Sequence, residues 1–491
     1  MTTDLRALGT RLRAAFMGGA LLFAAMTAAG AATLEIINID DPGVGFNDPT
    51  PVAPVGGNPA TTLGEQRQNV FQFVANFWGK RLKSDVPIQV LATFGPLDCT
   101  STQAVLGAAG AYNVFRDFPN AKKTGTWYPS ALANKLAGIQ LEPNPDPFVS
   151  ADIVAFFNGN LGQPGCLDGS GFYLGLDGKP TDPAQIDLLT TVLHEFGHGL
   201  GFQTFTDGET GLQFPAETAG DPGFPSIWDH YLLDPKQHKV WSAMTDGERA
   251  ASALVPRNLV WNGHKVTKTA PAVLDRGTPE LFVFGGGLNR VFMIGTAQFG
   301  PPIDKKTLIS TPLAVLPTPA TGGAACAPLA MSDAAKLRGR IAVIDRGACT
   351  FTTKVKNAQV AGARAVIIAD SVAGTPPPDL AGSDDTITIP AVRISKDDGA
   401  AIKAAVAAAP LPVLAPFGVL YDNLLKLAGA DYLNRVYLFT PNPYQGGSSV
   451  SHYDTSATPI LLMEPFAEPN QPIAVSAPKD LTLELLEDIG W

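Results

Sequence analysis

Two histidines and a glutamate stand together in the segment His194-Glu195-Phe196-Gly197-His198. Residues four apart share one face of a helix, so the imidazoles of His194 and His198 can reach a single metal ion. Glu195 would then stand beside the open coordination position of that ion. Zinc lowers the pKa of a bound water to about 7, and a nearby carboxylate can accept its proton as the water attacks a carbonyl. The segment therefore predicts a catalytic zinc site with Glu195 as general base.

The residues around this motif predict the helix that carries it. Apolar side chains recur at helical spacing at Ile186, Leu189, Leu193 and Phe196. Thr181 or Asp182 can cap the helix, and Pro183 suits its first turn. Gly199 and Gly201 are expected to end it. With only six histidines in the chain, a chance H-E-x-x-H within such a helix is improbable.

A catalytic zinc ion normally has three protein ligands, so a third is needed. The short pattern H-E-x-x-H-x-x-G-x-x-H matches through Gly201, but its last position is Thr204. Four other histidines remain, namely His230, His238, His264 and His452. Of these, His452 is followed by Met463 in a turn-like context. A histidine followed by a Met turn is the metzincin arrangement, in which the methionine lies beneath the metal.

These motifs together resemble the leishmanolysin-type metzincins, in which an insertion separates the H-E-x-x-H helix from the third histidine. The matching residues are His194, Glu195, His198, Gly201-Phe202, Ser448-Ser449, His452 and Leu462-Met463. The resemblance implies an α+β zincin-like (metzincin) catalytic domain that is a zinc endopeptidase. It also implies one catalytic Zn²⁺ held by His194, His198 and His452, with Met463 below the imidazoles and not bound to the ion.

The long interval before His452 contains a second resemblance. Residues 337–406 resemble a protease-associated (PA) domain, a small α/β module that accompanies exported proteases. The resemblance rests on Gly339 to Gly347, Cys349-Thr350-Phe351, Lys354-Val355, Ala358, Ala361-Gly362-Ala363 and Ile389 to Val392. The chain is accordingly divided into a signal peptide (1–31), a first catalytic part (32–299), an inserted PA domain (300–418) and a second catalytic part (419–491). Residues 32–150 match no motif.

Hydrophobic periodicity predicts the main elements of both units. In the first unit we expect strands at 33–39, 88–94 and 152–157 and a helix at 63–79. In the inserted unit we expect strands at 340–345, 365–369 and 389–394, with helices at 351–361 and 397–408. A last helix is expected at 481–489.

The N-terminus predicts export. Arg6, Arg11 and Arg13 precede an apolar run at residues 14–27, and Ala29-Gly30-Ala31 offers a cleavage site. No later run is long and apolar enough to cross a bilayer, so we expect a secreted or periplasmic protein without membrane contact after cleavage. Four cysteines in an exported chain favour disulfides. Their positions predict two bridges, Cys99–Cys166 and Cys326–Cys349.

Composition limits the partners. The chain has 491 residues, a net charge of −10 and a pI of about 5.1, with no long basic run, which excludes nucleic acid as a partner. Protein or peptide substrates are expected, and the sequence does not indicate the oligomeric state. Calcium sites are compatible with the many aspartates, but no ligand loop of defined spacing is present.

Three alternatives stay open at this stage. In gluzincin-like peptidases the third ligand is a glutamate on a later helix, and Glu217 would be the candidate, although Pro215 and Gly220 make a poor helix. PA domains also accompany serine proteases and aminopeptidases, but no G-x-S-x-G elbow is present. The third is a non-catalytic, zinc-stabilised extracellular binding protein that uses the PA domain for protein interaction. Glu195 argues against it, because a structural zinc site needs no general base.

Overall fold

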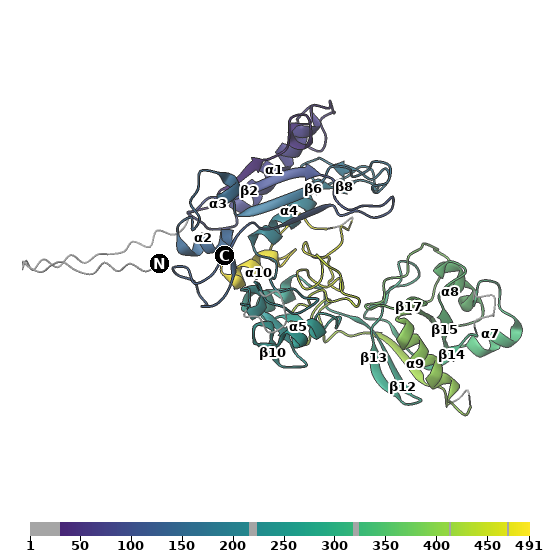
Figure 1. Ribbon diagram of the computed structural model, residues 1–491. Coiled ribbons are helices and arrows are strands. Elements are labelled where there is room, and N and C mark those ends of the chain that lie inside the picture. Colours follow the sequence, from purple (N-terminus) through teal and green to yellow (C-terminus); the bar gives the residue numbers. More distant parts are fainter. Residues whose placement is uncertain (1–29, 216–222, 318–323, 412–413, 469–470) are drawn as a thin grey trace, which may run out of the picture.

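The computed structural model describes residues 30–215, 223–317, 324–411, 414–468 and 471–491. The expected signal peptide lies almost wholly outside these ranges, and so does Glu217. Within them, no helix has both the length and the apolar character that a membrane span requires. Figure 1 shows an N-terminal lobe, a separate lobe formed by the middle of the chain, and a C-terminal segment that runs between the two.

The N-terminal lobe is built on a four-stranded sheet of order β1-β2-β6-β3. Its strands are β1 (Leu34–Asn38), β2 (Ile88–Gly95), β6 (Ile153–Asn158) and β3 (Gly107–Ala111). The first three run parallel, whereas β3 pairs antiparallel with β6 and forms one edge. The expected strands at 33–39, 88–94 and 152–157 are thus confirmed to within a residue or two, but β3 was not expected, since its sequence Gly-Ala-Ala-Gly-Ala has little strand character.

Two helices of this lobe pack against each other beside the sheet. Helix α1 spans Leu63–Gly79, as expected, and begins where the Thr62 side chain accepts a hydrogen bond from Glu65 N. Its Trp78 Nε1 donates to the carbonyl of Leu193 in helix α4 (Leu188–Leu200), at 3.3 Å. The expectation of a cap at Thr181 or Asp182 was wrong. Asp187 caps α4, because the chain just before it is extended and pairs with β7.

Shorter elements complete the lobe. The paired strands are β4 (Val114–Phe115) with β5 (Tyr128–Pro129), β7 (Phe172–Tyr173) with β8 (Ile186–Asp187), and β10 (Lys239–Val240), β9 (Leu232–Asp234) and β11 (Val260–Trp261) in one small sheet. The remaining helices are α2 (Ser130–Ala137), α3 (Pro147–Ser150), α5 (Asp246–Ser252), α6 (His264–Thr269) and, near the C-terminus, α10 (Thr482–Ile489).

The middle lobe is one seven-stranded sheet of order β13-β12-β18-β14-β15-β16-β17. Its strands are β12 (Pro279–Gly285), β13 (Leu288–Phe292), β14 (Leu308–Val315), β15 (Ile341–Asp345), β16 (Ala365–Ala369), β17 (Ala391–Ile394) and β18 (Phe417–Asp422). Its helices are α7 (Met331–Leu337), α8 (Phe351–Val360) and α9 (Lys396–Ala407). Strands β14 to β17 run parallel. Alternate residues of β15 belong to different hydrophobic clusters, so both faces of this part of the sheet are covered.

The expected boundary at residue 300 falls inside this sheet. Strands β12 and β13 precede that residue, and β12 pairs with β18 from Pro279 to Phe284. Strand β14 lies after residue 300 but before the first strand expected in the inserted unit, at 340–345. The two ends of the lobe meet where the backbone N–H of Asn423 donates to the carbonyl of Thr278 at 2.9 Å. The chain therefore leaves and re-enters the N-terminal part at one place.

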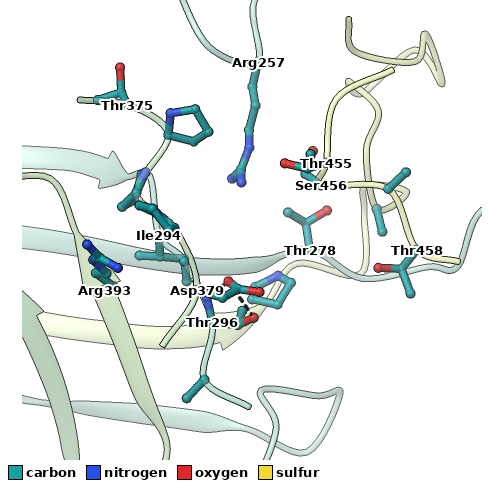
Figure 2. A pocket seen from close by; sticks show the side chains of 18 of the residues that line it. Arg257, Thr278, Ile294, Thr296, Thr375, Asp379, Arg393, Thr455, Ser456 and Thr458 are labelled. Carbon is teal, nitrogen blue, oxygen red and sulfur yellow. Dashed lines mark hydrogen bonds between the residues drawn. The ribbon is translucent and has the colours of Figure 1, made fainter. Parts of the chain in front are cut away.

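A cavity of about 1160 Å³ lies between the middle lobe and the C-terminal segment. Figure 2 shows Arg257 reaching into it, with Ile294 and Thr375 on one side and Thr455 and Ser456 on the other. The two walls are joined by Thr375 and Asn442, whose backbone groups exchange two hydrogen bonds of 2.7 Å.

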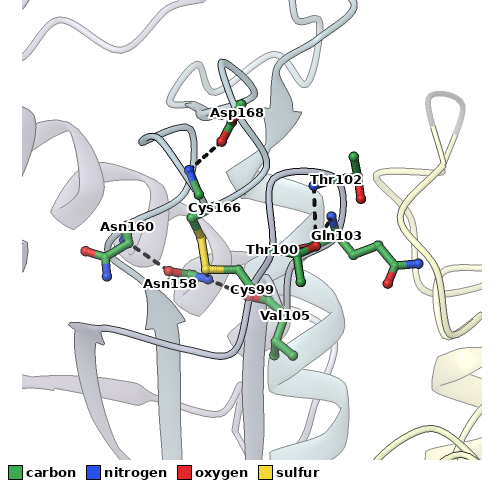
Figure 3. Close-up of a disulfide and its surroundings, with 10 residues drawn as sticks. Cys99, Thr100, Thr102, Gln103, Val105, Asn158, Asn160, Cys166 and Asp168 are labelled. Carbon is green, nitrogen blue, oxygen red and sulfur yellow. Dashed lines mark hydrogen bonds between the residues drawn. A yellow bond between two sulfur atoms is a disulfide. The ribbon is translucent and has the colours of Figure 1, made fainter.

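Both expected disulfides are present. Cys99–Cys166 links two loops of the N-terminal lobe (Figure 3), and Cys326–Cys349 lies in the middle lobe. No free cysteine remains in the described residues. Bridges that each join residues of a single lobe stabilise that lobe by restricting its unfolded chain.

Candidate metal centre

Helix α4 is held close to its neighbours by glycines. A Cβ at Gly199 would lie 2.4 Å from Ile153 Cγ2 of β6, so only glycine lets the helix approach the sheet this closely. On another side, a Cβ at Gly197 would lie 2.8 Å from the sulfur of Met463. The middle of α4 is thus packed between the sheet and the segment that carries Met463, and the histidines on either side of Gly197 have fixed positions.

The structure brings His194, His198 and His452 together. Their Nε2 atoms form a triangle with sides of 3.1, 3.2 and 3.2 Å. Among the residues that the structure describes, this is the one group of three histidine, cysteine or carboxylate side chains whose ligand atoms could share a metal ion. His198 and His452 are buried, and His194 is partly exposed, so the cluster is open to solvent on one side.

Hydrogen bonds set the tautomer of all three rings. The Nδ1 atoms of His194, His198 and His452 lie 2.7, 2.7 and 2.8 Å from the carbonyl oxygens of Leu462, Phe202 and Ser448. A carbonyl only accepts, so each Nδ1 carries the proton and each neutral ring presents an Nε2 lone pair to the other two. Three lone pairs at this separation repel one another, and a cation between them removes that repulsion.

Burial keeps these rings neutral. It lowers the pKa of His194 to about 4 and that of His198 to about 3, and it lowers the pKa of His452 as well. Neutral imidazole is the form that binds metal. The triangle also has a suitable size, because its centre lies about 1.8 Å from each nitrogen, less than the roughly 2.0–2.1 Å of a zinc–nitrogen bond. All three nitrogens can therefore reach one zinc ion.

Glu195 follows His194 in α4, and its side chain contacts the edge strand β3. Its side chain is buried, and it accepts a hydrogen bond from the backbone N–H of Ala109. A Cβ at Gly107 would lie 3.1 Å from Glu195 Cγ, so the small residues of β3 make room for the carboxyl group. Burial raises the pKa of Glu195 to about 8. A carboxyl group with a raised pKa beside a cluster of metal-ligand type is suited to proton transfer.

The C-terminal segment positions His452 and Met463. The backbone N–H of Tyr453 donates to the carbonyl of Met463 at 2.9 Å, which fixes the two residues relative to each other. Asp480 accepts from Leu462 N and from Thr482 N, both at 2.7 Å, and so joins the turn to helix α10. Met463 is fully buried.

The other candidate residues lie elsewhere. Thr204, at the position of a third histidine in the short pattern, donates its hydroxyl to Asp229 at 2.6 Å, and its backbone N–H donates to Ser451 Oγ. His230 hydrogen-bonds with Thr126. His238 lies in the turn between β9 and β10, and His264 begins α6. Glu217, the rival ligand, lies outside the described residues.

Sequence reasoning did not find the groups that orient the histidines. Three of them are backbone carbonyls, of Phe202, Ser448 and Leu462, and a carbonyl carries no residue-type signal. Asp480 also went unnoticed, since an aspartate before a helix reads as an ordinary cap. The match at Ser448-Ser449 was the only sequence feature that pointed to one of these carbonyls, that of Ser448.

Comparison with known families identifies the type of domain in the middle lobe. Residues 309–402 match the family model of the PA domain. These residues form a PA domain. The match begins in β14 and ends in α9, so the strands β12, β13 and β18 are pairing partners outside the matched range. The matched range includes none of the residues of the histidine cluster, so the PA domain match does not indicate the function of that cluster.

Curated relatives match this chain only over short stretches. Aminopeptidase YwaD of Bacillus subtilis is 44% identical over 70 residues, which are 14% of this chain and 15% of the relative. A receptor homology region, transmembrane domain- and RING domain-containing protein 1 of Oryza sativa subsp. japonica is 43% identical over 79 residues, 16% of this chain and 15% of the relative. The chain thus spans about 15% of the length of these relatives. Their names describe two different kinds of protein.

Solved structures give a similarly partial likeness. BSAP, a zinc aminopeptidase from Bacillus subtilis, shows 25% identity and a TM-score of 0.22, over 33% of this chain and 36% of that one. A Peptidase M28 precursor from Shewanella amazonensis shows 14% identity and a TM-score of 0.19, over 32% and 40%. Scores this low say nothing about the rest of the chain.

Proposed function

We propose that this chain is an exported zinc-dependent endopeptidase of the metzincin type. The observation that carries the proposal is the convergence of three unprotonated Nε2 atoms, from His194, His198 and His452, beside the buried Glu195. Three histidine ligands and one open position are typical of catalytic rather than structural zinc. The PA domain and the two disulfides fit an exported hydrolase that acts on proteins or peptides.

His194, His198 and His452 would hold the ion. When bound, zinc supplies a Lewis acid that polarises the scissile carbonyl and makes a water ligand acidic. Glu195 accepts the proton of the attacking water and then passes it to the leaving amine. A cation nearby favours the ionised carboxylate, which offsets the effect of burial on the pKa of Glu195.

Strand β3 offers a place for the substrate backbone. It is the edge of its sheet, and Ala109 N donates to Glu195 rather than to another strand. An extended peptide that adds to such an edge is aligned by main-chain hydrogen bonds. A peptide held there passes beside Glu195 in its middle, which favours cleavage within a chain over removal of a terminal residue.

The proposal is tested by peptide hydrolysis with zinc-loaded protein. Casein and a peptide blocked at both ends serve as substrates, and wild type is compared with Glu195→Gln. The exposed Glu142→Gln is the matched control. We expect Glu195→Gln to retain zinc and lose activity by orders of magnitude, while Glu142→Gln behaves as wild type. Hydrolysis by Glu195→Gln at the wild-type rate would refute the role of Glu195, and cleavage restricted to substrates with a free amino terminus would make the enzyme an exopeptidase.

A further inference from the structure

The cavity between the PA domain and the C-terminal segment contains an arginine without a proper partner. Arg257 Nε is buried and makes no hydrogen bond, and its nearest carboxylate oxygen is Asp454 Oδ1 at 3.5 Å. The terminal guanidinium nitrogens have no hydrogen-bond partner among the described residues. The side chain is 23% exposed, and Figure 2 shows it directed into the cavity.

Asp454 makes only a long contact with this arginine, and its Oδ2 is itself buried without a hydrogen-bond partner. Its Oδ1 already accepts hydrogen bonds from the backbone and the hydroxyl of Ser456, and its side chain is fully buried. The contact with Arg257 uses Nε alone, so the paired donors at the end of the guanidinium stay available for a second carboxylate. Arg257 also holds a left-handed backbone, with φ of 53°, which is costly for a residue with a side chain.

We propose that this cavity binds a peptide segment through one carboxylate group, which pairs with the guanidinium of Arg257. A planar guanidinium with two free parallel donors fits a carboxylate in a bidentate arrangement. The cavity volume of about 1160 Å³ exceeds the roughly 300–1,000 Å³ of small-molecule pockets, so it has room for a stretch of peptide. The hydroxyl of Thr455 lies near Arg257 and can bond the peptide backbone. The hydroxyls of Thr278 and Ser456 already donate to Leu427 and Asp454, so they can only accept from a peptide N–H.

The excess of acidic over basic residues in the cavity disfavours a ligand with many negative groups. The acidic residues that line it are Asp275, Asp304, Asp370, Asp379, Asp422, Glu464 and Glu468. Four arginines line it as well, Arg257, Arg276, Arg346 and Arg393, and two of these, Arg346 and Arg393, pair with Asp370. The remaining negative charge would repel a polyanion such as a phosphorylated segment, whereas one carboxylate can sit at Arg257 itself.

The placement of the cavity gives this binding a role. One wall belongs to the lobe that contains the PA domain, and the other is the segment that also carries His452 and Met463. A protein held here is tethered next to the catalytic unit, which raises its effective concentration at the histidine cluster. This role rests on the proposed function, but the binding itself does not require hydrolysis.

The test measures binding of short dye-labelled peptides to the zinc-loaded, full-length protein in the Glu195→Gln background, by fluorescence polarisation. The peptides are amidated and identical except for one central residue, Glu, Gln or Lys. A fourth has Gln at the centre and a free C-terminal carboxylate. We expect the Glu peptide or the free-carboxylate peptide to bind at least about tenfold more tightly than the amidated Gln peptide, since a charged hydrogen-bonded pair is involved. These two arms distinguish an internal acidic side chain from a chain terminus.

Variants of the cavity complete the test. Arg257→Gln should abolish the preference for the carboxylate, and Arg257→Lys should retain part of it, because lysine keeps the charge without the planar pair of donors. Thr455→Trp fills the cavity from an exposed position without removing any contact of Arg257, and should block binding. Arg290→Gln, outside the cavity, controls for the lost charge. Three results would each overturn the proposal, whether or not the chain proves to be a peptidase. They are equal binding of the Glu and Gln peptides, tightest binding of the Lys peptide, and full binding by both Arg257→Gln and Thr455→Trp.

Discussion

His194 Nδ1 lies 2.7 Å from the carbonyl oxygen of Leu462, although 268 positions separate the two residues in the chain. This contact joins the H-E-x-x-H helix directly to the turn that contains Met463. It orients the imidazole of His194 and leaves its Nε2 free toward His198 and His452. The cluster therefore depends on the docking of the C-terminal segment as much as on α4.

The first prediction concerns the third ligand. His452→Ala should lower zinc affinity by more than about a hundredfold, beyond the 10–100-fold typical of residues that only support a ligand. His230→Ala is the matched control, because His230 hydrogen-bonds with Thr126 away from the cluster. Zinc affinity is measured by competition with a chromogenic chelator. If both variants bind zinc like wild type, His452 is not a ligand.

The second prediction concerns the support of the Met turn. Asp480→Ala removes the acceptor of the hydrogen bonds from Leu462 N and Thr482 N and leaves both buried donors unpaired, at a cost of about 1–3 kcal/mol each. We expect a lower melting temperature and weaker zinc binding. Asp146→Ala, which removes the cap of the short surface helix α3, is the comparison. Zinc affinity that stays unchanged in Asp480→Ala would show that the turn does not position His194.

Much of the site could be predicted from the sequence, and the reasons are local. His194, Glu195 and His198 lie within one helical turn, so their spacing alone gives a shared face. His452 required a match to a known arrangement, since no periodicity links it to α4. The start of α4 was misplaced because Pro183 resembles a first-turn proline, whereas the pairing of β8 with β7 delays the helix to Leu188.

The cavity could not be predicted at all. Arg257, Thr296, Thr375 and Ser456 come from four distant parts of the chain, and only tertiary packing brings them together. The extent of the middle sheet could not be predicted from the sequence either. Strand β12 pairs with β18, which follows more than a hundred residues later, and such pairing leaves no mark on the local sequence.

The third prediction concerns the limits of the middle lobe. Deletion of residues 279–422 should leave a folded, zinc-binding protein, because Asn423 N already donates to Thr278 O and a short linker can join these ends. Deletion of residues 300–418 removes β14 to β17 and the first two residues of β18. The remainder of β18 then has no partner on its β14 side, so this deletion should give insoluble or unstable protein. Zinc content and solubility of the two deletions are compared. Equal behaviour would contradict the boundaries set by the sheet.

The fourth prediction concerns a buried ion pair in the PA domain. Asp370 lies between Arg346 and Arg393, which hold the pKa of its carboxyl below the usual value despite the opposing effect of burial. A depressed folded-state pKa stabilises the protein above the unfolded pKa of about 3.9, and this contribution is lost as pH falls through the folded value. Asp370→Asn should therefore cost about 3–5 kcal/mol at neutral pH. The difference from wild type should shrink in strong acid, as followed by chemical unfolding. A pH-independent difference would rule out the charge as its cause.

The fifth prediction concerns the disulfides. Loss of Cys99–Cys166, which spans 67 positions, should cost about 1 kcal/mol more than loss of Cys326–Cys349, which spans 23, if chain entropy dominates. The paired variants Cys99→Ser/Cys166→Ser and Cys326→Ser/Cys349→Ser are compared by thermal unfolding. A larger loss from the shorter bridge would show that local packing, rather than loop length, sets the contribution.

The central claim is that His194, His198 and His452 hold one zinc ion. X-ray absorption at the zinc edge of the metal-loaded protein tests it most directly, with His452→Ala measured beside wild type. We predict one ion per chain, three imidazole nitrogens at roughly 2.0–2.1 Å, and the loss of one imidazole from the spectrum of any zinc that His452→Ala retains. A wild-type spectrum with two imidazoles and a protein carboxylate, or one that His452→Ala leaves unchanged, would contradict the account.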